Sequence, residues 1–181
     1  MLTSPTPSPA HRLAGVVYIG GPVPTRAFHF QYMTPFLGEA LGPLLTESAD
    51  VYTRAFPKFV DACLFEPAKT LRYEDKARWV GEAGMAPQVT RILIEKVSRS
   101  HDTTGWEDAL RKLPMLVVQG REDMLVDGEK CKKAFTETFG GSFEWLWVDE
   151  TGHTPFWERP EIVEATLVPF VQKAGQGKGT K

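Results

Sequence analysis

Two short polar segments of the sequence carry side chains that can exchange protons. The first, GRED, follows the apolar run LVVQ and ends at Asp123; the second, GH, follows LWVDET and ends at His153. Histidine gains and loses a proton near neutral pH, and a carboxylate bonded to one ring nitrogen fixes the tautomer and stabilises the cation. His153 is therefore a candidate general base, and Asp123 is its candidate orienting acid, although either segment alone is common.

Three apolar segments predict the strands that must position this pair. They are LAGVVYIGG at 13–21, PMLVVQG at 114–120 and FEWLWV at 143–148. Segments that are apolar on both faces are typical of a parallel sheet covered by helices. Helical patterns follow the second and third segments, so the C-terminal third alternates strand and helix. Because parallel strands end at one edge of a sheet, we expect Asp123 and His153 to meet there.

Residues 24–112 differ from the rest, because they are helical in pattern, rich in aromatic residues and interrupted by proline. The segment ESADVYTRAFPKFVDACLF has apolar residues at helical spacing with Pro57 inside it, which predicts a kink or two short helices. APQVTRILIEKVSRS and GWEDALRKL predict further helices. An insertion of roughly 90 residues is long for a plain crossover between strands, and it indicates a lid over a site.

Composition limits the classes of function. The chain has 181 residues, a net charge of −2, 42% hydrophobic and 24% charged residues, which is typical of one globular domain. Nothing in the charge pattern points to nucleic acid, and no apolar run approaches the ~20 residues of a membrane span. Cys63 and Cys131 lie in helical patterns, which favours packing roles and a cytoplasmic location. The histidines lack metal-ligand spacing, so we expect neither metal nor cofactor.

The two ends of the sequence differ from the domain between them. Residues 1–10, MLTSPTPSPA, lack the apolar core of a secretory signal and predict a disordered leader. Residues 173–181 are rich in glycine and lysine and predict a flexible tail. The packed domain is therefore expected at 11–172.

The segments LPMLVVQGREDMLVDGEK and GHTPFWERPEIV resemble the C-terminal part of the α/β-hydrolase fold family. In that family the acid follows the seventh strand in a G-x-x-D context and the histidine follows the eighth strand in a G-H context, which match Asp123 and His153. HRLAGVVYIGG resembles the sixth strand, which precedes a helical cap. The resemblance implies a partial α/β-hydrolase fold: a three-stranded parallel sheet flanked by helices, with the cap at roughly 24–112.

The resemblance also implies a reaction. His153, oriented by Asp123, would be the general base in hydrolysis of an ester- or epoxide-like bond in a small hydrophobic substrate. The family nucleophile lies in G-x-S-x-G, or is an aspartate in the same turn, and neither this motif nor the oxyanion-hole loop occurs in the 181 residues. We therefore expect the isolated chain to be inactive. The alternative is a non-catalytic binding or regulatory protein derived from such a hydrolase, and a third explanation is an incomplete gene model.

Without the first five strands of that family, the segment at 13–19 becomes an apolar sheet edge, which favours self-association.

Other residues have two interpretations each. Asp127 is expected to cap a helix, with a second acid as the alternative. Residues 155–157 either pack the closing helix on the sheet or line a pocket, and His29 either packs or faces that pocket. Glu122 is expected to face solvent. The aromatic residues of the cap either roof a pocket or form plain core: Phe28, Phe30, Tyr32, Phe36, Phe56 and Phe59.

Overall fold

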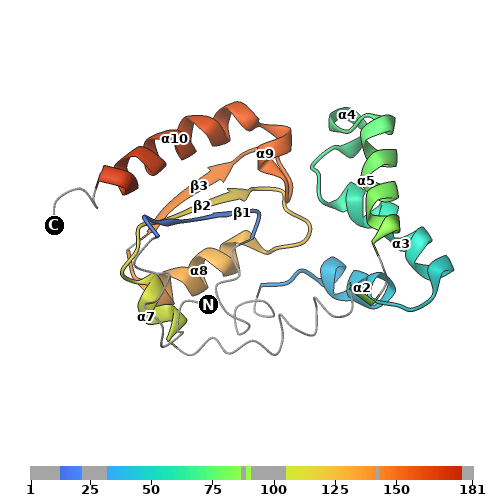
Figure 1. Ribbon diagram of the computed structural model, residues 1–181, viewed down its shortest axis with the longest axis horizontal. Coiled ribbons are helices and arrows are strands. Elements are labelled where there is room, and N and C mark those ends of the chain that lie inside the picture. The colour runs from blue at the N-terminus through green and yellow to red at the C-terminus, as the bar shows by residue number, and fades with distance from the viewer. Residues whose placement is uncertain (1–12, 22–31, 87–88, 91–104, 142, 177–181) are drawn as a thin grey trace.

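The computed structural model shows a small parallel sheet. The structure describes residues 13–21, 32–86, 89–90, 105–141 and 143–176. Strands β1 (Val16–Ile19), β2 (Met115–Gly120) and β3 (Phe143–Val148) pair in parallel in the order β1-β2-β3 (Figure 1). The three strands expected from the sequence are confirmed, although β1 is shorter than its apolar segment.

Helices cover both faces of this sheet. Helix α8 (Gly128–Phe139) packs on one face, where Phe135 is fully buried, and α10 (Pro160–Gln176) packs on the other, where Phe170 is buried (Figure 1). Side chains of a strand alternate between the two faces, so β2 feeds both apolar clusters. Every residue of β2 is buried, and its only hydrogen-bonding side chain is that of Gln119.

A group of helices stands beside the carboxyl ends of the strands (Figure 1). It comprises α2 (Pro35–Leu44), α3 (Ala49–Ala62), α4 (Pro67–Thr70) and α5 (Tyr73–Met85). The short helix α7 (Trp106–Leu110) lies instead near the start of β2 (Figure 1). The first four therefore lie beside the sheet edge that carries the candidate residues.

Helix α3 settles one part of an expectation. It runs as one helix from Ala49 to Ala62 with Pro57 inside it, so the alternative of two short helices was wrong. An internal proline costs about 3 kcal/mol in a helix. Ring contacts beside the proline act against this cost, because Phe56 stacks on Tyr52 at 5.3 Å and contacts Phe59 at 6.0 Å.

The closing helix also extends further than expected. Helix α10 continues to Gln176, so residues 173–176 belong to the packed domain and not to a flexible tail. Ala174 is buried, and Lys173 pairs with Glu144 of β3 at 2.9 Å, which accounts for the extra turn. The predicted leader, the rest of the tail and most of the helix predicted over 86–100 lie outside the described residues. Among the helices that are described, none is long and apolar enough to cross a membrane.

Candidate active site

The structure brings the two sequence-predicted residues together. Asp123 follows β2 and His153 follows β3, and these strands are neighbours in the sheet. Oδ2 of Asp123 lies 2.9 Å from Nδ1 of His153. The Asp123 side chain is 1% exposed and the His153 side chain is 29% exposed. The acid is therefore enclosed by protein, while the imidazole ring remains accessible.

Four hydrogen bonds surround the Asp123 carboxylate. Its Oδ1 accepts from the main-chain N–H of Leu125 at 2.8 Å and of Val126 at 3.1 Å. Its Oδ2 accepts from Nε2 of Gln119 at 2.7 Å in addition to the His153 contact. An ionised carboxylate can only accept, so Nδ1 of His153 must carry a proton. The neutral ring then has an unprotonated Nε2, which is the atom a general base needs.

Two glycines allow the strand-end loops to approach. A Cβ added to Gly120 would lie 1.8 Å from the carbonyl oxygen of Gly152, and one added to Gly152 would lie 2.8 Å from the carbonyl oxygen of Cys63. Side chains at either position would push the acid loop, the histidine loop and the helical group apart. The glycine that precedes His153 in the sequence is thus required by close packing.

Glu122 adds a further tie between the two loops. Its main-chain N–H donates to the carbonyl oxygen of Thr151 at 3.0 Å, and its Oε2 accepts from the N–H of Thr151 at 3.1 Å. The expectation that Glu122 faces solvent was incomplete, because the side chain is only partly exposed and is held by this bond. It therefore helps to fix the loop that carries the histidine.

The segment after α3 docks on the histidine loop from the other side. The carbonyl oxygen of Cys63 accepts from the N–H of His153 at 2.8 Å and from Oγ1 of Thr154 at 3.2 Å. Glu158 bridges the same two segments, because Oε1 accepts from the N–H of Phe65 at 2.7 Å and Oε2 from the N–H of Gly152 at 2.8 Å. Burial raises the pKa of the Glu158 carboxyl above its ordinary value, despite these two donors. Hydrogen bonds thus join the segment after α3 to the loop that carries His153.

The sequence did not predict two residues of this site. Gln119 and Glu158 contact the acid and the histidine loop, yet neither was singled out. The one available signal for Gln119 was an amide side chain at the end of an otherwise apolar strand. Glu158 gave none, because its partners are main-chain N–H groups of distant segments.

His153 lines an apolar hollow of about 250 Å³. Its other lining residues come from the end of β1, the start of α2, α3 and the loop after β2: Gly20, Gly21, Tyr32, Met33, Leu37, Phe59, Leu125 and Val126. A hollow of this composition suits an apolar group of a ligand beside the imidazole.

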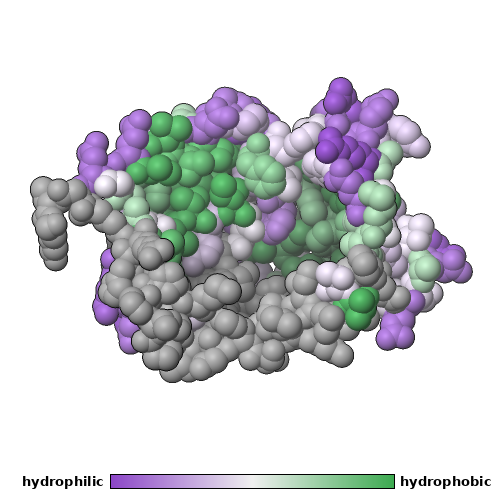
Figure 2. All heavy atoms as spheres, in the orientation of Figure 1, coloured by the Kyte–Doolittle hydropathy of each residue, from purple (hydrophilic) through white to green (hydrophobic). Residues whose placement is uncertain are grey.

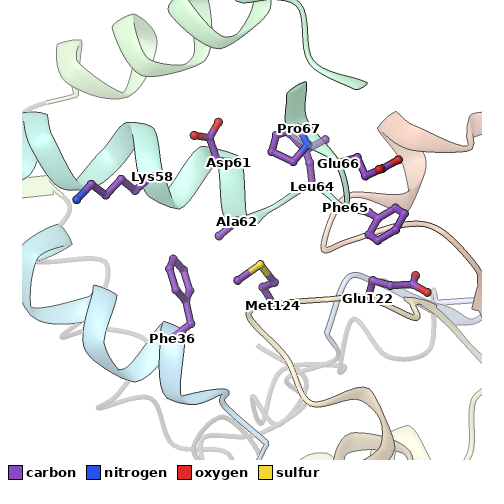
Figure 3. Close-up of a pocket in the computed structure, with 10 residues that line it drawn as sticks. All are labelled: Phe36, Lys58, Asp61, Ala62, Leu64, Phe65, Glu66, Pro67, Glu122 and Met124. Carbon is purple, nitrogen blue, oxygen red and sulfur yellow. The ribbon is translucent and has the colours of Figure 1, made fainter. Parts of the chain in front are cut away.

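A second, larger hollow of about 530 Å³ lies between α2, the segment after α3 and the loop after β2 (Figure 3). Phe36 and Met124 face one another across it, and Lys58, Asp61 and Glu122 lie at its margin (Figure 3). In the space-filling view, hydrophobic residues gather over the sheet and α10 and again in the depression between the sheet and the helical group (Figure 2).

The cap aromatic residues divide between the two interpretations. Tyr32 is 1% exposed and belongs to the core, although its ring also borders the smaller hollow. Phe36 and Phe59 line hollows, whereas Phe56 packs among neighbouring rings of α3. Phe28, Phe30 and the remaining histidines, His11, His29 and His101, lie outside the described residues.

The residues after His153 pack in two directions. They form the short helix α9 (Pro155–Glu158), which contacts β2, and Pro155 is buried. Phe156 is 51% exposed, and Trp157 makes an edge contact with Trp79 of α5 at 4.9 Å between ring centroids. The tryptophan therefore also packs against the helical group, which the sequence did not predict. Asp127 does cap α8, since its Oδ1 accepts from the N–H of Lys130 at 3.0 Å.

The two cysteines are free thiols. Cys131 is a fully buried residue of α8, and Cys63 is partly buried after α3. Burial raises the pKa of both thiols to about 12, so neither is a thiolate near neutral pH. Within the described residues, no cluster of histidine, cysteine and carboxylate side chains is placed to hold a metal ion.

Comparisons with known proteins identify the fold. No family model matches the chain, and no curated protein matches it. Solved structures do match. Among them are a protein assigned as an aryl esterase from Burkholderia cenocepacia (TM-score 0.72, 20% identity), an esterase from Rhodococcus sp. ECU1013 (0.66, 21%) and a 2-hydroxy-6-oxo-6-phenylhexa-2,4-dienoate hydrolase from Rhodococcus sp. strain RHA1 (0.63, 19%). They cover 91%, 88% and 87% of this chain.

The match is partial in the other direction. The chain spans 56%, 56% and 55% of these three proteins, that is, about half of their length. Identities this low establish the fold and leave the activity open. Since the matched proteins are α/β-hydrolases, the three-stranded parallel sheet with its flanking helices is a partial α/β-hydrolase fold, as the sequence predicted.

Proposed function

We propose that this chain provides the acid–base machinery of an α/β-hydrolase-type enzyme that cleaves an ester- or epoxide-like bond in a small hydrophobic substrate. One observation carries the proposal: the enclosed Asp123 carboxylate bonds Nδ1 of His153 at 2.9 Å, and the ring borders an apolar hollow. The fold it shares with esterases and other hydrolases supports the reaction class.

In this proposal His153 acts twice. Its Nε2 first takes the proton of an attacking hydroxyl, and the resulting imidazolium, stabilised by Asp123, returns a proton to the leaving group. His153 then deprotonates a water molecule that hydrolyses the covalent intermediate. Asp123 remains ionised throughout and keeps the ring in the required tautomer.

The nucleophile must come from a different segment, because no G-x-S-x-G motif occurs in the 181 residues. Within the described part of the chain, β1 pairs only with β2, and so one edge of β1 can accept another strand. We assign the nucleophile and the oxyanion-hole donors to a polypeptide segment that pairs there. Without that segment we expect the chain to be inactive and to self-associate through this edge.

Other parts of the proposal rest on composition. Free cysteines suit a reducing compartment, so we propose a cytoplasmic location. A net charge of −2 without a basic surface stripe in the sequence argues against nucleic acid as a partner.

Ester hydrolysis tests the proposal. We expect the purified 181-residue chain to release no nitrophenol from p-nitrophenyl butyrate above the buffer rate. The product of the complete reading frame that contains this chain should carry a nucleophile and hydrolyse the ester, and His153→Ala should lower kcat/KM at least about a thousandfold. Asp149→Asn is the matched control, because Asp149 is an exposed carboxylate on the same loop, and it pairs with the surface residue Arg121. Turnover by the chain alone that is lost in His153→Ala would refute the assignment of the nucleophile.

A binding or regulatory protein is the second candidate, and the larger hollow favours it. That hollow is apolar at its centre and is not lined by His153, so it could retain a ligand without catalysis. This candidate predicts a monodisperse chain that binds an unreactive apolar ether in calorimetric titration and loses the affinity in Phe36→Asp. A reading frame without any nucleophile, together with such binding, would favour it over the hydrolase.

A further inference from the structure

The buried amide of Gln119 has no role in the chemistry described above. Gln119 lies in the central strand β2 and is 0% exposed. All of its polar atoms have partners: Oε1 accepts from the N–H of Gly21 at 2.9 Å, while Nε2 donates to Oδ2 of Asp123 at 2.7 Å and to the carbonyl oxygen of Gly120 at 3.3 Å. An amide without such partners would cost about 1–3 kcal/mol to bury.

The partners leave the amide only one orientation. The Gly21 main chain can only donate through its N–H, so the oxygen of the Gln119 amide must face it. The nitrogen then faces Asp123, which accepts. An ionised Asp123 can only accept, so the Nδ1 atom of His153 must also donate. The donor and acceptor of each bond are thus fixed along the series Gly21, Gln119, Asp123 and His153.

The same amide holds a second wall of the site. The Gly20–Gly21 turn after β1 lies directly against His153, since a Cβ on Gly20 would be 2.2 Å from the His153 carbonyl oxygen and one on Gly21 would be 3.5 Å from its Cε1. Both glycines have positive φ, 71° and 83°, and both line the smaller hollow. The bond from Gly21 to Gln119 fixes this turn relative to the carboxylate that orients the ring.

We propose that Gln119 is a positioning residue that sets the tautomer of His153 and the place of the Gly20–Gly21 turn together, so that the ring is held between the acid and the end of β1. Its importance for catalysis rests on the proposed function, whereas its structural effect does not. An apolar residue in its place would leave the Gly21 N–H without this acceptor and take one of two donors from the Asp123 oxygen that bonds the histidine.

Nuclear magnetic resonance of the full 181-residue chain tests this inference. Three variants are compared with the wild type. Gln119→Leu removes both ties. Gln119→Glu keeps an acceptor for Gly21 and places a second carboxyl group against Asp123. Thr151→Val is the control for loss of a buried polar group, because Thr151 is 0% exposed and its Oγ1 donates to the carbonyl oxygen of Val148.

We expect Gln119→Leu to speed hydrogen exchange of the Gly21 amide about tenfold and to displace or broaden the His153 Nδ1 proton resonance. Gln119→Glu should keep the Gly21 protection and still displace that resonance, and it decides the matter if Gln119→Leu does not fold. Thr151→Val should change neither reading. Unchanged readings in both Gln119 variants, or equal changes in Thr151→Val, would overturn the inference. Neither reading depends on turnover, so an absence of hydrolysis by the product of the complete reading frame would count against the proposed function alone.

Discussion

Replacement of Asp123 by asparagine perturbs the site by a single atom. The carboxylate accepts four hydrogen bonds, from two main-chain N–H groups, Gln119 and His153. An asparagine oxygen can keep the two main-chain bonds, but its NH₂ group then meets the Gln119 and His153 donors. Hydrogen bonds to a charged group contribute about 1.5–3 kcal/mol each, so the gross loss is about 3–6 kcal/mol. Relief from burying a charge offsets part of it, and the histidine recovers a weaker bond by moving its proton to Nε2.

We therefore expect Asp123→Asn to lower the free energy of unfolding by about 2–4 kcal/mol, and to leave His153 unable to act as a base. Urea unfolding followed by tryptophan fluorescence measures the first effect. Asp149→Asn is the control: Asp149 is exposed and pairs with Arg121 at the surface, so its replacement should change the free energy of unfolding by no more than about 0.5 kcal/mol. If Asp123→Asn matched this control, the reasoning that the four bonds are satisfied by an ionised carboxylate would be refuted.

Three further predictions concern the surroundings of the site. Burial raises the pKa of Glu158, so the folded state binds that proton more tightly than the unfolded state, and stability is lost as pH rises from about 4.5 through the raised pKa. In urea unfolding at several pH values, Glu158→Gln should lack this fall, and Glu164→Gln on the exposed surface of α10 should keep it. The same pH dependence in the wild type and both variants would contradict the prediction. Burial raises the pKa of the Cys63 and Cys131 thiols to about 12, so both should react with iodoacetamide far more slowly in the native chain than in the urea-unfolded chain. Mass spectrometry measures the two rates, and equal rates would argue against the burial of these thiols. Gly152→Ala should destabilise the chain by about 1–3 kcal/mol, because the added methyl group would clash with the main chain of Cys63 and Leu64. The control Gly81→Ala, in open space within α5, should stabilise the chain by up to about 1 kcal/mol. If Gly152→Ala did not lower stability, the histidine loop and the segment after α3 would not pack as described.

The sheet and the pairing of acid with base could be predicted because both depend on local patterns. Segments apolar on both faces identify buried parallel strands, and strands that are neighbours end at the same edge. Asp123 and His153 each follow such a strand directly, so their distance is set by strand pairing. The helical group was also visible, since its length exceeds that of a plain crossover.

Contacts between distant segments could not be predicted. Glu158 and Gln119 bond main-chain N–H groups of Phe65, Gly152 and Gly21, and a main-chain donor leaves no trace in residue type. The contact of Trp157 with the helical group depends on where that group docks, which no local pattern records. Pro57 favours a break in the local pattern, yet α3 continues through it as one helix, and the contact of Phe56 with Tyr52 is not visible in that pattern.

The tautomer of His153 tests the central claim most directly. A long-range ¹⁵N–¹H correlation spectrum of the 181-residue chain, recorded where the ring is neutral, distinguishes the protonated from the unprotonated ring nitrogen. A histidine held by Asp123 as a general base predicts a protonated Nδ1 and an unprotonated Nε2. A proton on Nε2, or an even mixture of the two tautomers, would contradict the account.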